Sequence, residues 1–172
     1  MKIPTRGWLL LVSQLFGAAR LLAGRAEGTL EFYWIDVEGG AATLIVTPAG
    51  ESVLIDSGNP GGRDPGRIAA AARAAGLDHI DHYITTHFHA DHFGGAAELA
   101  AALPLRNLND NGTPASAATS DPRWPQLIEA YAAIPGTRHV ARAGLEIPLR
   151  QTADRPSLAL TCLGARQEFI PA

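Results

Sequence analysis

The sequence predicts a layered α/β domain in which a strand delivers a group of histidines to a loop. Runs rich in β-branched and aromatic residues alternate with alanine-rich, helix-like segments. The most distinctive polar motif, from Thr86 to His92, directly follows one of the strand-like runs. At 172 residues, with 47% hydrophobic and 18% charged residues, the chain has the composition of one globular domain.

The first segment has the order of a secretory signal peptide. Lys2 and Arg6 precede an apolar run from Trp8 to Ala19, and small residues follow this run. The run is too short to span a bilayer well. We therefore expect residues 1–26 to direct export to a secreted or periplasmic location and residues 27–172 to form the domain. A buried amphipathic helix is the alternative.

The segment after the expected signal peptide is acidic. Of the 14 basic residues, four precede residue 27, so ten remain against 17 acidic ones, a formal charge of −7. The only lysine is Lys2, and there is no basic run, so nucleic acid is not indicated as a partner and a nuclease is disfavoured. Cys162 is the single cysteine, which we expect to be a small buried hydrophobe, with a ligand role as the alternative.

The secondary structure expected before Pro104 consists of four strands and two helices. Strand 30–37 ends in a glycine turn, a hairpin joins strands 43–47 and 52–56, and strand 80–86 leads into the histidines. Asp64 as N-cap, Pro65 in the first turn and Gly76 as the stop predict a helix over 65–75. A short helix over 96–103 ends at Pro104.

Beyond Pro104 the pattern is less regular. Residues 107–121 are expected to form a polar loop. Apolar residues then recur at helical spacing and are expected in the core rather than in a ligand pocket: Trp124, Leu127, Ile128, Tyr131 and Ile134. Two further strands are expected over 139–149 and 157–163.

The motif from Thr86 to His92 has the donor density of a transition-metal site. On an extended backbone His87 and His89 project to the same side and can hold one ion together. Asp91 and His92 follow where the chain turns into a helix, and they can point at a second position. The spacing therefore suggests two adjacent metal sites, and a satisfied polar loop is the alternative.

The other histidines are weaker candidates. His79 and His82 lack ligand spacing and are expected to be solvated. His139 is a candidate third ligand, but its surroundings indicate a strand that enters a glycine turn. Asp56 follows a strand beside glycine, where a simple strand-end cap is the alternative to a functional role.

Thr-His-Phe-His-Ala-Asp-His-Phe-Gly-Gly, from Thr86 to Gly95, resembles the hallmark of the metallo-β-lactamase superfamily. The stretches from Asp36 to Leu44 and from Val53 to Gly58 are similar to the branch that contains DNA-uptake competence proteins and their exported hydrolase-like relatives. Ala41 departs from that branch, which usually carries an acidic residue after the glycine turn.

The resemblance implies a layered αββα sandwich, of which this chain supplies roughly the N-terminal αβ half. It implies a hydrolase that uses metal-bound hydroxide on an ester, amide or phosphodiester bond. His87 and His89 would bind the first metal, and Asp91 and His92 the second. Asp91 would also act in catalysis by orienting or deprotonating the attacking water, and Asp56 would orient a ligand histidine. Zinc is expected, with two divalent ions in the complete fold, and manganese or iron are alternatives.

The further ligands that the family takes from its second half have no counterpart in the sequence. After His139 there is no histidine, and the carboxylates are Glu146, Asp154 and Glu168. We therefore expect a C-terminally truncated domain with an exposed apolar sheet face that promotes self-association. A catalytically inactive remnant or metal-binding module is the alternative to an enzyme.

Overall fold

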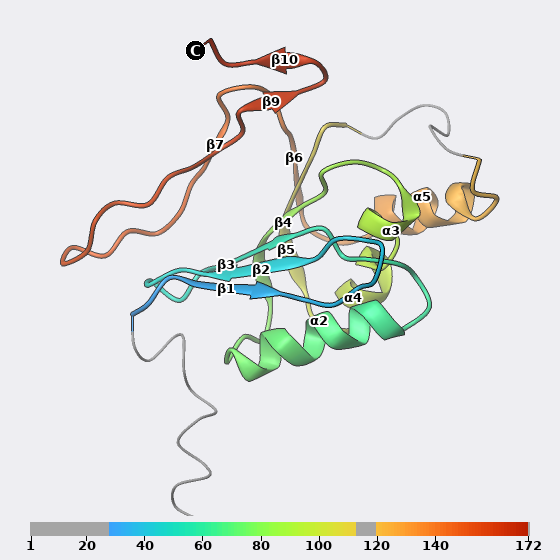
Figure 1. The fold of residues 1–172 in the computed structure, drawn as a ribbon, viewed down its shortest axis with the longest axis horizontal. Coiled ribbons are helices and arrows are strands. Elements are labelled where there is room, and N and C mark those ends of the chain that lie inside the picture. Colours follow the sequence, from blue (N-terminus) through green and yellow to red (C-terminus); the bar gives the residue numbers. More distant parts are fainter. Residues whose placement is uncertain (1–27, 113–119, 172) are drawn as a thin grey trace, which may run out of the picture.

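The computed structural model describes residues 28–112 and 120–171, and the predicted signal segment lies outside them. Six strands form one sheet in the order β1-β2-β3-β4-β5-β6 (Figure 1). They are β1 (Glu31–Trp34), β2 (Thr43–Val46), β3 (Ser52–Ile55), β4 (Ile80–Ile84), β5 (Leu105–Asp110) and β6 (Thr137–Val140). The first three strands are antiparallel neighbours, whereas β3 to β6 run parallel. The loops that follow β3, β4, β5 and β6 therefore leave the same edge of the sheet.

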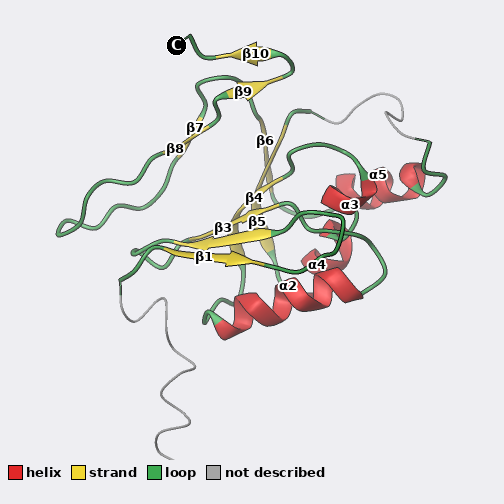
Figure 2. Cartoon of the chain, in the orientation of Figure 1, coloured by secondary structure: helices red, strands yellow, loops and turns green. Residues whose placement is uncertain are grey.

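The helices pack against one face of this sheet (Figure 2). They are α2 (Arg63–Ala74), α3 (Ala90–Phe93), α4 (Ala96–Ala102) and α5 (Trp124–Ala132). Leu44, Leu54, Tyr83 and Leu108 are paired in register across four strands, and all four are buried in the core with the apolar helix residues. Burial of each such side chain contributes about 1.5–3 kcal/mol. One sheet covered by helices on one face is the predicted α/β half of the layered sandwich.

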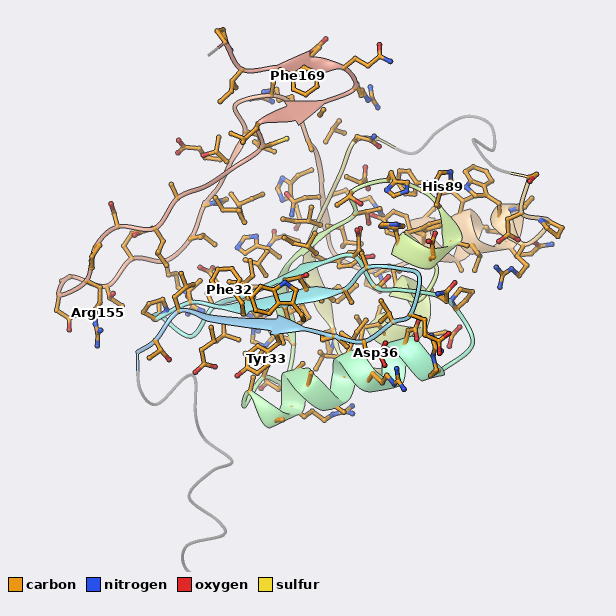
Figure 3. The ribbon with its side chains drawn as sticks, viewed as in Figure 1. Phe32, Tyr33, Asp36, His89, Arg155 and Phe169 are labelled. Atoms are coloured by element: carbon orange, nitrogen blue, oxygen red, sulfur yellow. The ribbon has the colours of Figure 1, made fainter. Side chains whose placement is uncertain are left out.

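The opposite face of the sheet is apolar over β1 to β3 and polar over β4 and β5. Phe32, Ile45 and Val53 are paired across β1 to β3, and the same row continues into His82 and Asn107 on β4 and β5. Phe32 is 48% exposed, and its ring is stacked on that of Trp34, which is 80% exposed (Figure 3). The expected apolar face is therefore limited to the β1 side of the sheet, and self-association through it stays a prediction.

Beyond β6 the chain forms two small hairpins that project from the sheet (Figure 1). One pairs β7 (Glu146–Ile147) with β8 (Leu160–Thr161), and the other pairs β9 (Gly164–Ala165) with β10 (Glu168–Phe169). The range 139–149, expected to be one strand, is instead divided between the end of β6 and β7, and the strand expected over 157–163 is reduced to β8. Only two residues pair in each strand of β7 and β8. Cys162 is half-buried rather than buried.

The structure corrects the expected start of α2. The helix begins at Arg63, after Gly62 with φ 82°, so Asp64 is not its N-cap. Asp64 is 1% exposed and instead accepts a hydrogen bond from the backbone N of Asn59 at 2.8 Å. Its carboxylate holds the loop before the helix, which the two preceding glycines allow to turn sharply.

The structure also shows a strand where a loop is expected. Residues 107–110 belong to β5, and its Leu108 is fully buried on the face of the sheet that the helices cover. Asn107 and Asn109 alternate with Leu108 and lie on the polar face, so the sequence lacks the apolar run that usually marks an interior parallel strand. The aromatic helix after it is confirmed in the core, since Trp124 is 5% and Tyr131 1% exposed. Within the described residues, none of the helices has the length and apolar character needed to cross a membrane.

Candidate metal centre

The histidine motif lies at the edge of the sheet where the parallel strands end, between β4 and α3. Phe88 is buried, and its ring centroid is 5.2 Å from that of Phe93 and 5.4 Å from that of Tyr131. The indole N–H of Trp124 donates to the carbonyl of Phe88 at 3.0 Å. Because side chains alternate along an extended backbone, burial of Phe88 turns its two histidine neighbours away from the core.

The three imidazoles of the motif lie against one another. The ring centroid of His87 is 4.6 Å from that of His89 and 4.0 Å from that of His92. Asp91 adds a carboxylate, with Oδ2 3.9 Å from Nε2 of His92. Burial, followed by the neighbouring charges of His92 and His89, lowers the pKa of His87. His87 is therefore neutral at pH 7, which is the form that binds a metal.

The donor set fits a divalent transition metal in its chemistry, because it combines imidazole nitrogens with a carboxylate. However, within residues 28–112 and 120–171 no three His, Cys, Asp or Glu side chains are arranged to enclose one ion. The cluster thus offers donors on one side of a site. The assignment of individual ligands stays a prediction.

Asp56 holds the cluster in place from its buried side. It follows β3 with φ 60° and is 1% exposed. Its Oδ1 accepts from the backbone N of Thr86 at 2.8 Å, and its Oδ2 accepts from the hydroxyl of Thr86 at 2.7 Å. Oδ2 is also 2.8 Å from Nδ1 of His92. A carboxylate only accepts hydrogen bonds, so Nδ1 of His92 carries the proton and Nε2 is left with its lone pair.

Two turns hold the backbone of α3 in place. The backbone N and the hydroxyl of Ser57 both donate to the carbonyl of His92, at 2.6 and 3.1 Å. The backbone N of Ala41 donates to the carbonyl of Asp91 at 3.2 Å. A Cβ on Gly40 would lie 2.1 Å from that carbonyl oxygen, so only glycine fits there. The glycine turn after β1 therefore supports the motif directly.

The expectation that His79 and His82 are solvated is wrong. His82 is 5% exposed, and its Nε2 lies 3.3 Å from Oε1 of Glu51. The side chain of His79 is 16% exposed, with Nε2 3.0 Å from Oδ1 of Asp81. The reason is tertiary: β4 is flanked by β3 and β5, so polar side chains at and beside it are covered and acquire buried partners.

The remaining histidine candidate lies on β6. Nε2 of His139 is 3.3 Å from Oδ1 of Asn107, on the polar face of the sheet. In the described part of the chain, its ring does not stack with those of the three clustered histidines. The structure therefore does not bring this candidate into the cluster.

Sequence reasoning missed a polar network behind the motif. The hydroxyl of Tyr131 donates to Oδ2 of Asp110 at 2.8 Å and accepts from the hydroxyl of Thr85 at 3.2 Å. Burial strongly raises the pKa of Tyr131, which keeps this donor protonated. The network joins the ends of β4 and β5 to α5. Its sequence signal is an aspartate at a strand end shortly before Gly112.

Residues 35–116 match the model of the metallo-β-lactamase superfamily. Over this stretch the chain is similar to the superfamily. It is 34% identical over 90 residues to a UPF0173 metal-dependent hydrolase of Cupriavidus metallidurans, and this match covers 51% of the chain and 28% of that protein. The resemblance expected from the motif is thereby confirmed.

Several solved structures of the superfamily are also similar to the chain. The metallo-β-lactamase SMB-1, in a complex with mercaptoacetic acid, is 19% identical with a TM-score of 0.49, covering 69% of this chain and 46% of that one. A metallo-β-lactamase of Cronobacter sakazakii is 23% identical with a TM-score of 0.45, covering 75% and 47%. The chain thus spans 28% of the length of the curated relative and less than half of each of these two solved structures.

Proposed function

We propose that this chain acts as a metal-dependent hydrolase whose ions, zinc in the first instance, are held by His87, His89, Asp91 and His92. The observation that carries the proposal is the gathering of these imidazoles and the carboxylate at the edge of the sheet, with one imidazole fixed by a buried carboxylate. The match to a metal-dependent hydrolase supports it. The bond cleaved is an ester, amide or phosphodiester in a small substrate.

Each side chain of the cluster has a distinct task. Divalent ions held by these residues would lower the pKa of a bound water molecule and polarise the bond under attack. His87 is neutral and offers a nitrogen lone pair, since the pKa of its imidazole is lowered. Asp56 holds His92 so that Nε2 points outward. Asp91, whose side chain is 39% exposed, is the carboxylate that can orient the attacking water and accept its proton.

A metal-binding module without turnover is the second candidate. It is favoured by the one-sided cluster, because no three donors among the described residues enclose an ion. Binding by fewer ligands is expected to be much weaker than in a full structural zinc site, which contributes about 10–16 kcal/mol.

Metal content and turnover distinguish the two candidates. The purified chain is loaded with zinc, its metal content is measured, and hydrolysis of p-nitrophenyl acetate and bis-p-nitrophenyl phosphate is followed. Bound zinc with turnover that is lost in His89→Ala supports the hydrolase. His139→Ala is the matched control, because that histidine contacts Asn107 instead of the cluster. Bound zinc without turnover supports the module, and no bound zinc contradicts both.

Export is the remaining part of the proposal. The order of charged, apolar and small residues in segment 1–26 supports a signal peptide and a secreted or periplasmic protein. Mass spectrometry of the protein recovered from the periplasm or medium tests it. If the protein still begins at Met1, whether it is exported or retained in the cell, cleavage of a signal peptide is contradicted.

A further inference from the structure

A hollow lies beside the histidine motif, between the ends of β4 and β5 and the β9–β10 hairpin. Its volume is about 370 Å³, within the range of sites for small organic ligands. Ile84, Ala141, Ala165 and Phe169 supply apolar wall, and Arg166 lies at the turn of the hairpin. The hollow therefore combines apolar surface with one cation.

Thr86 connects this hollow to the candidate metal centre. Thr86 is one of the residues that line the hollow, and its Oγ1 is 3.1 Å from Nδ1 of His87 and 2.7 Å from Oδ2 of Asp56. A molecule that occupies the hollow consequently has the metal donors beside one of its ends. The hollow is therefore a candidate substrate subsite.

The guanidinium of Arg166 is held in place without being neutralised. Its Nε donates to the carbonyl of Asn111, which tethers the hairpin to the loop after β5. Gly112 makes room for it, because a Cβ there would lie 2.0 Å from Nη2 of Arg166. Among the residues that the structure describes, no carboxylate forms an ion pair with Arg166. Its charge is thus available to a ligand.

The turn that presents Arg166 has an unfavourable backbone. Arg166 and Gln167 have φ values of 52° and 66°. Two-residue hairpin turns of this kind favour Asn-Gly, because side chains other than glycine, asparagine and aspartate are disfavoured at positive φ. Backbone strain of this kind is often retained where a side chain has a functional role.

We propose that this hollow binds the substrate through a carboxylate on a short aliphatic chain, with the carboxylate on Arg166 and the chain against Phe169 and Ile84. The substrate of the hydrolase is then a small anionic molecule, and the inference rests on the proposed function for the reaction that follows binding. The acidic domain otherwise repels anions, so a fixed guanidinium is needed to admit one.

Binding of hexanoate to the metal-free full chain tests the inference independently of hydrolysis. Affinity is measured by titration of the backbone amide NMR signals of Gly112 and Gly164. We expect saturable binding, about tenfold weaker in Arg166→Gln and about tenfold weaker for the neutral isostere hexanamide, since a charged hydrogen bond is lost in both. Arg155→Gln is the matched control, because Arg155 lies at the far end of the β7–β8 hairpin (Figure 3) and should leave the affinity unchanged.

The possible outcomes separate this inference from the proposed function. Absence of saturable hexanoate binding, equal binding of hexanamide, or unchanged affinity in Arg166→Gln overturns the subsite. Hexanoate binding that depends on Arg166, in a protein without zinc-dependent turnover, retains the subsite and overturns the hydrolase alone. In an active protein, a raised KM for a carboxylate-bearing ester in Arg166→Gln, with kcat retained, supports the subsite.

Discussion

Asp56→Asn is the most informative substitution in the candidate metal centre. The change preserves shape, and asparagine tolerates the φ of 60° at this position, so packing and backbone are left intact. The amide oxygen can still accept from the backbone N of Thr86. The amide nitrogen faces the Thr86 hydroxyl, which can rotate to accept, and Nδ1 of His92, which must give up its proton. The substitution therefore replaces one charge-assisted hydrogen bond and reverses the His92 tautomer.

The magnitude follows from these contacts. A hydrogen bond to a charged group contributes about 1.5–3 kcal/mol, so the free energy of unfolding of the metal-free chain should fall by about that amount. The reversed tautomer places a proton on Nε2, and loss of such an orienting partner typically costs about 10- to 100-fold in metal affinity. Urea denaturation and competition titration with zinc measure the two effects, and 15N shifts of the imidazole report the tautomer.

Asp36→Asn is the control for this experiment. Its side chain is 74% exposed and pairs with Arg67 at the surface, so the free energy of unfolding should change by less than about 0.5 kcal/mol. If Asp56→Asn behaves like this control in both stability and zinc affinity, then Asp56 does not hold His92 and the reasoning is refuted.

Three further outcomes are expected. Gly40→Ala should lower the free energy of unfolding by about 1–3 kcal/mol, because its Cβ would meet the carbonyl of Asp91 at 2.1 Å, whereas Gly39→Ala has no neighbour within 4 Å and should change it little; equal effects in urea denaturation would contradict the geometry. For Asp81, burial raises the pKa of the carboxyl group, but hydrogen bonds from its neighbours lower it further, so the net pKa lies below 3.8. The ionised Asp81 therefore stabilises the folded state above pH 3.8, and this contribution is lost as the pH falls through the lowered pKa. Asp81→Asn should flatten the fall in Tm there, and an unchanged acid profile would count against this. Trp34→Thr should shift the chain toward monomer in sedimentation velocity, and a monomeric parent protein would argue against association through the β1 side of the sheet.

The sequence was sufficient for the features that depend on neighbouring residues. Because His87 and His89 are two residues apart, they lie on the same side of an extended backbone, and the centroids of their rings are 4.6 Å apart in the structure. The helical spacing of Trp124 and Tyr131 likewise predicted a buried helix face, which is observed. Both inferences need only local geometry, because the period of the backbone decides which side chains share a face.

Other features were decided by strand order, which local patterns do not contain. Asn107 and Asn109 suggest a loop, yet they lie in β5 because β4 and β6 supply hydrogen-bonding partners on both sides. His82 is buried for the same reason, since the interior position of β4 brings Glu51 to its imidazole.

The motif from Thr86 to His92 shows the same division. Its composition by itself predicted a candidate metal site and the resemblance to the superfamily, because the donors lie within seven consecutive residues. Only the tertiary structure showed that Asp56, 36 residues away from His92, selects its tautomer, and that the hairpin carrying Arg166 closes a hollow beside it. Both depend on residues that are distant in the chain and meet only when the parallel strands end at one edge of the sheet.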